Sequence, residues 1–229
     1  MRVLCIGDIH VPWTRKGYLQ FCKDLYYQWD CNAVVFIGDV VDLHAISFHE
    51  KEPDCPGAKE EYERTKVAVA QWYKAFSKAK VCIGNHDERV IRCTKSMNVP
   101  EVYLKSHNDT WGTPKWDWQP DHIIDDVYYY HGTGQSGLYP AANAVRKMLM
   151  SCVLGHNHTA SSVKYYANPM RRIFACDTGC GVDDKQMAFA YGRNNKQRSI
   201  ISAAVIIDGI PYVEPMPMGR NETYHDSNF

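Results

Sequence analysis

The stretch Val34-Val35-Phe36-Ile37-Gly38-Asp39 decides the fold class of this chain. Its apolar run has the length of a buried strand, and it stops at a glycine followed by a carboxylate. The stretch Val3-Leu4-Cys5-Ile6-Gly7-Asp8 shows the same pattern near the start of the sequence. Ligands in α/β proteins bind at the carboxyl ends of strands, so both carboxylates are predicted at the functional edge of a sheet.

Three more apolar runs end in polar motifs further along the chain. Glycine lies beside the polar residues in most of them, which lets the backbone approach a small ion closely. The motifs are Gly84-Asn85-His86-Asp87 after Val81-Cys82-Ile83, His131-Gly132 after Val127–Tyr130, and Gly155-His156-Asn157-His158 after Cys152-Val153-Leu154.

Together with Asp8-Ile9-His10, these strand ends supply a large set of candidate metal ligands. Seven ligands are too many for one ion, but they suit two ions that share a carboxylate, the arrangement used for in-line displacement at phosphorus. Mixed nitrogen and oxygen ligands suit Mn, Fe, Zn or Ni better than Ca or Mg. The predicted cofactors are therefore two divalent transition-metal ions, with Mn as the first choice. The candidate ligands are Asp8, His10, Asp39, Asn85, His131, His156 and His158.

Each motif taken alone has a simpler explanation. Asp-x-His and Gly-Asp are common in turns and caps, Asn85 alone suits a turn, and His131 alone suits a hydrogen-bonded core histidine. Gly155 to His158 alone suits a loop with two exposed imidazoles. The prediction of a metal site therefore rests on all five motifs occurring together at strand ends.

The order of the motifs from Asp8 to His158 resembles the calcineurin-like metallophosphoesterase superfamily. The resemblance implies an α/β fold, a four-layer αββα sandwich of two mixed sheets with flanking helices and a dimetal site at one sheet edge. It also implies how the ligands divide: one ion on Asp8, His10, Asp39 and His158, and a second ion on Asp39, Asn85, His131 and His156.

The resemblance further implies a mechanism of phosphoester hydrolysis. A hydroxide bridging the two ions attacks phosphorus in line, and the ions and Asn85 stabilise charge on the non-bridging oxygens. In this family the histidine at the position of His86 is not a ligand but the general acid toward the leaving oxygen. The following Asp87 is expected to hold the ring of His86.

The residues after Asp42 depart from the protein-phosphatase members of the superfamily, which carry Arg-Gly there to bind phosphate. Leu43-His44 stands in that place, which argues against a Ser/Thr protein phosphatase. Arg89, on a short predicted helix from Glu88 to Lys95, is a candidate for the missing phosphate clamp. Other candidates for substrate contact, with a plain surface position as the equal alternative, are His44, His49 and Glu50.

Three tryptophans, Trp111, Trp116 and Trp118, lie in a segment with Gly and Pro from Asn108 to Pro120. They suit either stacking on a base or covering a core edge, and we favour the core because buried aromatic rings contribute a large packing area. Beyond the superfamily, the runs Gly38–His49 and Gly84–Arg89 resemble uncharacterised phosphoesterases of bacteriophages and bacteria. That likeness indicates a bacteriophage or bacterial setting for the protein and does not indicate its substrate.

The composition predicts one domain over residues 1–215 and a flexible C-terminal tail over residues 216–229, in a chain of 229 residues. The chain carries 26 basic and 26 acidic residues, so its formal net charge is zero. Nucleic-acid binding depends on neutralising phosphates, and a neutral chain offers no global attraction to them. Basic pairs such as Arg171-Arg172 are expected to be solvated surface.

The nine cysteines form no C-x-x-C pair, which favours reduced thiols and a cytoplasmic location, that of the host if the chain is phage-encoded. Cys176 and Cys180 are a zinc pair only if a second pair completes the site, and none does. We expect no signal peptide, because Asp8 interrupts the first apolar stretch. The longest apolar run, Ile200–Ile207, is too short to span a bilayer.

The periodicity of the remaining chain predicts an α/β part followed by a mostly β part. Asp208-Gly209 between apolar runs is a strong hairpin signal. The predicted helices are Lys16–Trp29, Lys59–Lys78 and Ala141–Met150, and the predicted later strands are Ser162–Tyr166, Arg172–Cys176, Ile201–Ile207 and Ile210–Val213.

The predicted function is metal-dependent hydrolysis of a small phosphodiester or nucleotide. A nuclease of the Mre11 type and a phosphomonoesterase are the enzymatic alternatives, and zero net charge argues against the nuclease. A non-catalytic scaffold is the third class, and the complete ligand set with His86 argues against it. The expected partner is a small phosphoester; nucleic acid is not favoured, no membrane is expected, and the sequence leaves the oligomeric state open.

Overall fold

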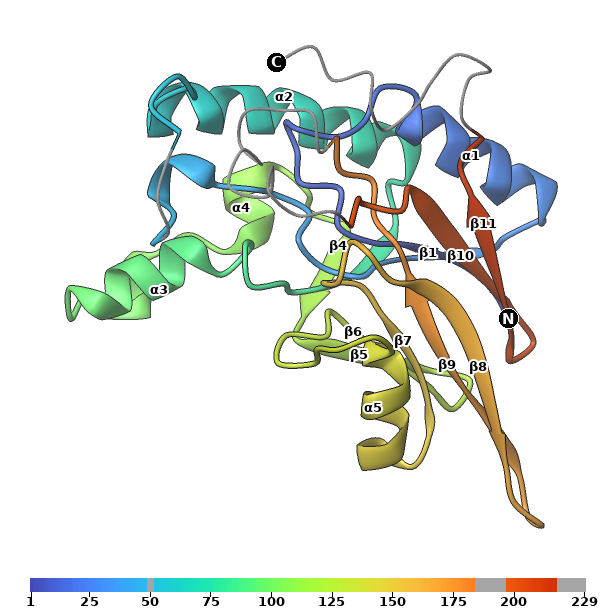
Figure 1. Cartoon of the computed structure of the whole chain (residues 1–229). Helices are drawn as coiled ribbons and strands as arrows, with labels where there is room; N and C mark the ends of the chain where they lie inside the picture. Colours follow the sequence, from blue (N-terminus) through green and yellow to red (C-terminus); the bar gives the residue numbers. More distant parts are fainter. Residues whose placement is uncertain (49–51, 184–196, 218–229) are drawn as a thin grey trace.

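The computed structural model describes residues 1–48, 52–183 and 197–217. Two mixed β-sheets pack face to face, one of six strands in the order β11-β10-β1-β2-β3-β4 and one of five in the order β5-β6-β7-β9-β8. Helices α1 and α2 cover the outer face of the first sheet, and α5 covers the outer face of the second (Figure 1). The predicted αββα sandwich is therefore confirmed.

The first sheet is built around the strand that opens the chain. Its middle strands run parallel, and a C-terminal hairpin adds two antiparallel strands beside β1. The strands are β1 (Arg2–Ile6), β2 (Ala33–Phe36), β3 (Ala79–Cys82), β4 (Trp116–Gln119), β10 (Ser202–Ile207) and β11 (Ile210–Pro215), and the covering helices are α1 (Tyr18–Gln28) and α2 (Ala58–Ala75).

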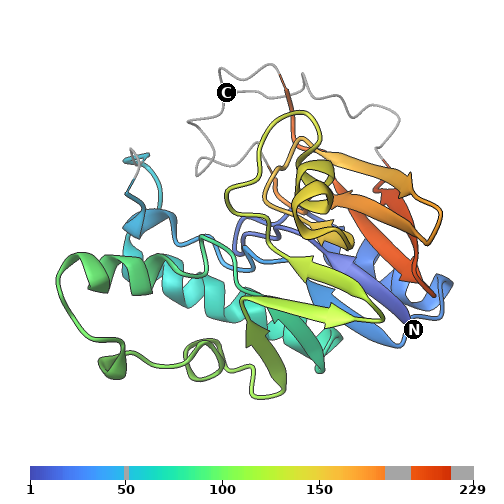
Figure 2. The same cartoon turned by 90° about the horizontal axis from the view of Figure 1, so that it is seen from below.

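The second sheet comes from the later part of the chain. Strands β6, β7 and β9 are parallel, and β5 and β8 pair antiparallel at the two edges. The strands are β5 (Asp121–Ile124), β6 (Val127–Tyr130), β7 (Ser151–Leu154), β8 (Ser161–Ala167) and β9 (Arg172–Thr178), and the helix is α5 (Pro140–Met148). Short helices lie between strands of the first sheet: η1 (His44–Ile46) after β2, and α3 (Arg89–Ser96), η2 (Glu101–Tyr103) and α4 (His107–Trp111) after β3. The last three extend to one side (Figure 2).

Alternation along the strands creates the layers. Side chains of successive strand residues point to opposite faces, so in β1 Leu4 and Ile6 pack under α1 and α2 while Val3 and Cys5 face the second sheet. Phe174 of β9 meets that inner face from the other side. Since both faces of the central strands are buried, their sequences are continuous apolar runs instead of alternating ones.

Most predicted elements are present with shifted ends. The three predicted helices correspond to α1, α2 and α5, and the Asp208-Gly209 turn joins β10 to β11 with both residues at positive φ. The stretch from Trp116 to Gln119, predicted only as part of a loop, is the edge strand β4. Trp111 and Trp116 are buried in the core beneath α2, as favoured from the sequence.

Other expectations have mixed outcomes. None of the nine cysteines, all of which lie in the described part of the chain, forms a disulfide. Among the helices that the structure describes, none has the length and apolar character needed to cross a bilayer. The predicted flexible tail falls almost entirely on residues 218–229, and His49 and Glu50 also lie outside the described residues.

Candidate metal centre

The seven candidate ligands converge at the carboxyl ends of strands from both sheets. Loops after β1, β2 and β3 carry Asp8, His10, Asp39 and Asn85, and loops after β6 and β7 carry the remaining three histidines. The loops hold each other in place, because the amide of His10 donates to the carbonyl of Asp39 at 3.0 Å and that of Gly155 donates to His131 at 3.1 Å. The fold thus brings together, at the strand ends, predicted ligands that lie far apart in the sequence.

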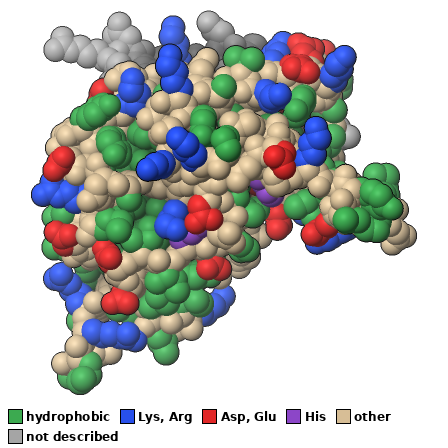
Figure 3. Space-filling view, turned by 180° about the vertical axis from the view of Figure 1, so that it is seen from behind, with side chains coloured by type: hydrophobic (Ala, Val, Ile, Leu, Met, Phe, Trp, Pro, Cys, Tyr) green, Lys and Arg blue, Asp and Glu red, His purple; other side chains and the backbone are tan. Residues whose placement is uncertain are grey.

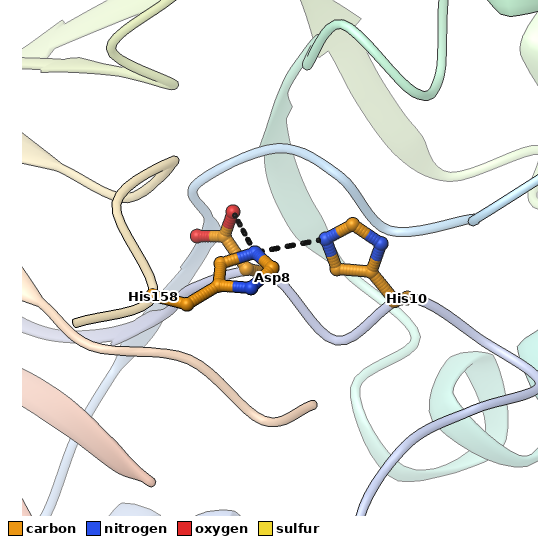
Figure 4. Close-up of side chains that lie close together, drawn as sticks. All are labelled: Asp8, His10 and His158. Carbon is orange, nitrogen blue, oxygen red and sulfur yellow. Dashed lines mark hydrogen bonds and ion pairs between the residues drawn. The ribbon is translucent and has the colours of Figure 1, made fainter. Parts of the chain in front are cut away.

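A first cluster contains Asp8, His10 and His158 (Figure 4). The Nε2 atom of His158 lies 3.2 Å from Nε2 of His10 and 3.4 Å from a carboxylate oxygen of Asp8. Asp8 and His10 are fully buried and His158 is partly exposed. Three ligand atoms of the predicted first ion therefore face one point.

A second cluster contains Asp39, His131 and His156. Nε2 of His131 lies 3.1 Å from Nδ1 of His156 and 3.2 Å from Oδ2 of Asp39. The side-chain oxygen of Asn85 lies 3.0 Å from the same Nε2 atom. All four ligands predicted for the second ion therefore surround one point.

Asp39 joins the two clusters. Its Oδ2 atom lies 3.2 Å from Nε2 of His131 in the second cluster and 3.6 Å from Nε2 of His10 in the first. Burial raises the pKa of Asp39, but the imidazoles of His131, His86 and His10 outweigh burial and hold it well below the usual range of a carboxyl group. Burial lowers the pKa of His131, and the charge of Asp39 more than reverses this, to about 10. This pocket strongly attracts positive charge.

Hydrogen bonds to the far nitrogen atoms orient two of the rings. Nδ1 of His10 lies 2.7 Å from a carboxylate oxygen of Asp42, and Nδ1 of His131 lies 2.9 Å from the carbonyl oxygen of Ile37. A proton on Nδ1 in each ring leaves the lone pair of Nε2 directed into the cluster. The donor set, its burial and this outer support fit divalent ions bound by nitrogen and oxygen.

The backbone at this site adopts conformations that few residues tolerate. Asp8, His10, Asp39 and His156 all have φ between 43° and 68°, in the left-handed region. Such positions cost roughly 1–3 kcal/mol each and persist where surrounding structure enforces them. Their concentration at four candidate ligands indicates that ligand placement is favoured over local backbone stability.

Glycine is required where the loops pass the carboxylates. A Cβ added to Gly84 would collide with the backbone and the carboxylate of Asp39, and one added to Gly155 would collide with the carboxylate of Asp8. The amide of His86 donates to Asp39 at 2.8 Å, and that of His156 donates to Asp8 at 2.9 Å. The close approach that glycine allows lets neighbouring amides fix both carboxylates.

The predicted role of Asp87 is wrong, because Asp42 contacts the ring of His86 instead. Nδ1 of His86 lies 3.0 Å from a carboxylate oxygen of Asp42. The carboxylate of Asp87 accepts the backbone N–H groups of Val41 at 3.1 Å and Gly84 at 2.8 Å, so it ties two loops together. Sequence reasoning gave Asp42 no role; its position three residues after Asp39 was the available signal.

His86 lies at the open side of the centre. Its Nε2 atom is 3.9 Å from Oδ2 of Asp39, and its side chain is 12% exposed. Burial lowers the pKa of His86, but the carboxylates of Asp39 and Asp42 outweigh burial and raise it above the ordinary value. His86 is also close enough to His10 and Asp39 to form a third candidate metal cluster, so its predicted role as acid needs a direct test.

Arg89 is already held by the protein. Its guanidinium donates to the carbonyl of Asp42 at 2.7 Å and lies 3.1 Å from Nε2 of His86. A guanidinium only donates, so His86 accepts this bond through Nε2 and carries its proton on Nδ1 in this arrangement. Arg89 therefore places a fixed positive charge beside His86, and its predicted contact with phosphate stays a prediction.

His44 differs from expectation, because it belongs to the interior of its loop. The ring is buried and accepts the amide of Glu52 at 3.2 Å. The carboxylate of Glu61, on α2, accepts the amides of His44 at 2.7 Å and Ala45 at 2.8 Å. These bonds fix the segment that follows Asp42 and give His44 a structural role in place of the predicted substrate contact.

A family model described as calcineurin-like phosphoesterase matches residues 1–175. No curated protein matches the chain by sequence. Similar solved structures include a metallophosphoesterase from Sphaerobacter thermophilus, with 15% identity, TM-score 0.48 and coverage of 95% of this chain and 88% of that one. A Pseudomonas putida nuclease has 12% identity, TM-score 0.45 and coverage of 93% of this chain and 87% of that one. A Chaetomium thermophilum Vps29 has 11% identity, TM-score 0.47 and coverage of 97% of this chain and 92% of that one. Similarity at this level carries no functional inference.

Proposed function

Because this chain belongs to the calcineurin-like phosphoesterase family, we propose that it hydrolyses a small phosphodiester or nucleotide with two divalent ions, Mn first among them, and with His86 as general acid. The observation that carries the proposal is the position of Asp39, whose Oδ2 atom faces ligands of both clusters. One carboxylate shared by two clusters is the geometry of a two-ion centre.

The ligands would hold the ions as the sequence suggests. Asp39 would be shared, Asp8, His10 and His158 would complete one position, and Asn85, His131 and His156 the other. Ions held there would supply a nucleophilic water of lowered pKa and would offset charge on the phosphoryl oxygens. Mn is the first choice and Zn, Fe or Ni the alternatives, on the basis of the mixed nitrogen and oxygen donors.

The chain itself contributes the proton for the leaving group. His86 is the only ring of the centre on which both Asp42 and Arg89 converge, among the residues that the structure describes. Asp42 contacts Nδ1 and favours a protonated ring, and Nε2 is the ring nitrogen that faces Asp39, at 3.9 Å. For Nε2 to donate to a leaving oxygen, the Arg89 contact must open, and a phosphate oxygen is the natural new acceptor for that guanidinium.

A diester is favoured over a monoester by the residues after Asp42. Leu43 is apolar and the ring of the buried His44 is occupied by the amide of Glu52, so a doubly charged terminal phosphate lacks the counter-charge that an arginine would supply there. Arg89, tied to the carbonyl of Asp42, is the residue that would reverse this preference. A scaffold without chemistry is disfavoured, because the ligand clusters and His86 are all present.

Turnover of a small panel tests the proposal. Bis-p-nitrophenyl phosphate, p-nitrophenyl phosphate and a DNA duplex are compared by kcat/KM in Mn²⁺ at two salt concentrations. We expect the small diester to be hydrolysed fastest and duplex DNA slowest. A strong preference for the monoester would indicate a phosphatase, preference for duplex DNA with steep salt dependence a nuclease, and no turnover with any metal a scaffold.

A further inference from the structure

The second sheet and α5 carry an uneven charge that the neutral total conceals. From Val127 to Cys176 the sequence has five Lys and Arg residues and no Asp or Glu. The next acid, Asp177, is buried, and its carboxylate is occupied by the amide of Ala141 at 2.9 Å and the hydroxyl of Ser162 at 3.1 Å. The rest of the chain is correspondingly acidic, so net charge is a poor guide to this part of the surface.

Four of the five cations, with two tyrosines, form what we call the α5 surface: Arg146, Lys147, Lys164, Arg171, Tyr139 and Tyr166. All four cations are exposed, and none forms an ion pair within residues 1–48, 52–183 and 197–217. Acids elsewhere in this sheet have partners of their own: Asp121 accepts the hydroxyl of Tyr128 at 3.0 Å, and Asp125 pairs with the N-terminus at 2.9 Å. On the opposite face of the molecule, basic and acidic side chains are interspersed (Figure 3).

Contacts connect Tyr139, Lys164, Tyr166 and Arg171 with one another or with the α5 segment. Tyr166 packs against the α5 cluster, and Arg171 donates to the carbonyl of Leu149 just after α5 ends. The ammonium of Lys164 lies 5.1 Å from the ring centre of Tyr139 and 5.8 Å from that of Tyr166. Cations and partly exposed rings therefore alternate across this face.

The α5 surface is connected to the metal centre. Lys147 donates to the side chain of Gln135 at 3.2 Å, and Asn157 donates to the carbonyl of Gln135 at 3.2 Å. Asn157 lies between the candidate ligands His156 and His158. Tyr139 ends the loop that starts at His131, so both loops bordering the surface also carry ligands.

We propose that the α5 surface binds single-stranded nucleic acid and leads one of its phosphodiesters to the metal centre. Unpaired cations neutralise successive phosphates, and tyrosine rings stack on bases that are not already paired. A duplex offers phosphates without free base faces, which is why a single strand is the fitting occupant. The inference rests on the proposed phosphodiesterase and names its substrate class.

Binding is measured by fluorescence anisotropy of a short labelled oligothymidylate with the full chain in EDTA, so that no strand is cleaved. Reversing two charges, Lys164→Glu with Arg171→Glu, should weaken binding at least about tenfold. The slope of log affinity against log salt should become shallower by roughly 1.4, since each neutralised phosphate on a single strand contributes about 0.7. Arg146→Glu with Lys147→Glu is an independent second pair on α5.

Lys66→Glu is the matched control. Lys66 is also exposed and lies 5.8 Å from the ring centre of Tyr62, but it is on α2, away from the α5 surface. It should change affinity less than twofold. Circular dichroism melting of each variant shows that weaker binding is not due to unfolding.

The outcomes separate this inference from the proposed function. Unchanged affinity in both charge-reversal pairs, or equal competition by duplex DNA or polyglutamate, overturns the α5 surface as a single-strand site. Hydrolysis of bis-p-nitrophenyl phosphate without oligothymidylate binding supports the proposed phosphoesterase activity and contradicts the proposed binding role of the α5 surface. Oligothymidylate binding without turnover of any phosphoester supports the proposed binding role of the α5 surface and contradicts the proposed catalytic activity.

Discussion

Asp39 has the most demanding position of any single residue, because its carboxylate faces ligands of both clusters. Asp39→Ala should therefore abolish metal binding, whereas His86→Ala should keep the metal and lower kcat on the order of 10²–10⁴-fold, as for a general acid. Metal content by mass spectrometry and turnover of bis-p-nitrophenyl phosphate are measured on both variants. Loss of metal from His86→Ala would show that His86 is a ligand.

Asp42 should control the pH range of activity. A general acid works while protonated, so activity falls as pH rises through its pKa. The carboxylate of Asp42 raises the pKa of His86, and Asp42→Asn should lower it and move the alkaline limb of the kcat/KM profile to lower pH. Asp87→Asn is the control, because its carboxylate contacts the amides of Val41 and Gly84 and leaves the ring of His86 untouched. Equal shifts in both variants would contradict the pairing.

The difference between Asp42 and Asp87 marks the limit of prediction at this scale. Ligand positions could be predicted because a strand end and a residue type suffice to place them. Which carboxylate contacts His86 depends on the path of two loops and on side-chain torsions. Both acids adjoin a motif in the sequence, and only the folded loops show that Asp87 turns toward backbone amides.

At the scale of the element, the turn after β3 depends on having no side chain at Gly84. Gly84→Ala should weaken metal binding at least tenfold, because the new methyl group displaces the carboxylate of Asp39. Gly57→Ala, before α2, is the matched control: a methyl group there meets no atom, so metal binding and melting temperature should stay unchanged. Titration of Mn²⁺ by calorimetry compares the two. Normal affinity in Gly84→Ala would show that the turn can relax.

Element prediction succeeded where apolar residues were consecutive and failed where they alternated with polar residues. Strands β1, β2 and β7 are buried on both faces, and their unbroken apolar sequences predicted them directly. The edge strand β4 alternates tryptophan with polar residues and ends before Pro120, so it resembled a loop. Its pairing with β3 is a tertiary contact that local sequence does not encode.

At the scale of the whole molecule, the ligands come from both sheets, so metal binding stabilises their packing. We expect two ions per chain, about 3.5–4 Å apart. Mn²⁺ at a hundred times its dissociation constant should add roughly 2.7 kcal/mol to the free energy of unfolding for one site. Mass spectrometry of the native protein and melting with and without EDTA measure both quantities. A single ion per chain, or no change in melting temperature, would contradict the two-ion centre.

The division of ligands between the sheets also has a consequence for synthesis of the chain. The first cluster joins Asp8 and His10 to His158, so it cannot form until all of β7 and the following turn have been made. Contacts between such distant residues form late, because closing a long loop costs entropy before any contact compensates for it. A nascent or truncated chain that ends before His158 therefore lacks a complete first site. Metal capture at that position would report that the chain has been translated at least as far as His158 and that the loops after β1 and β7 have come together.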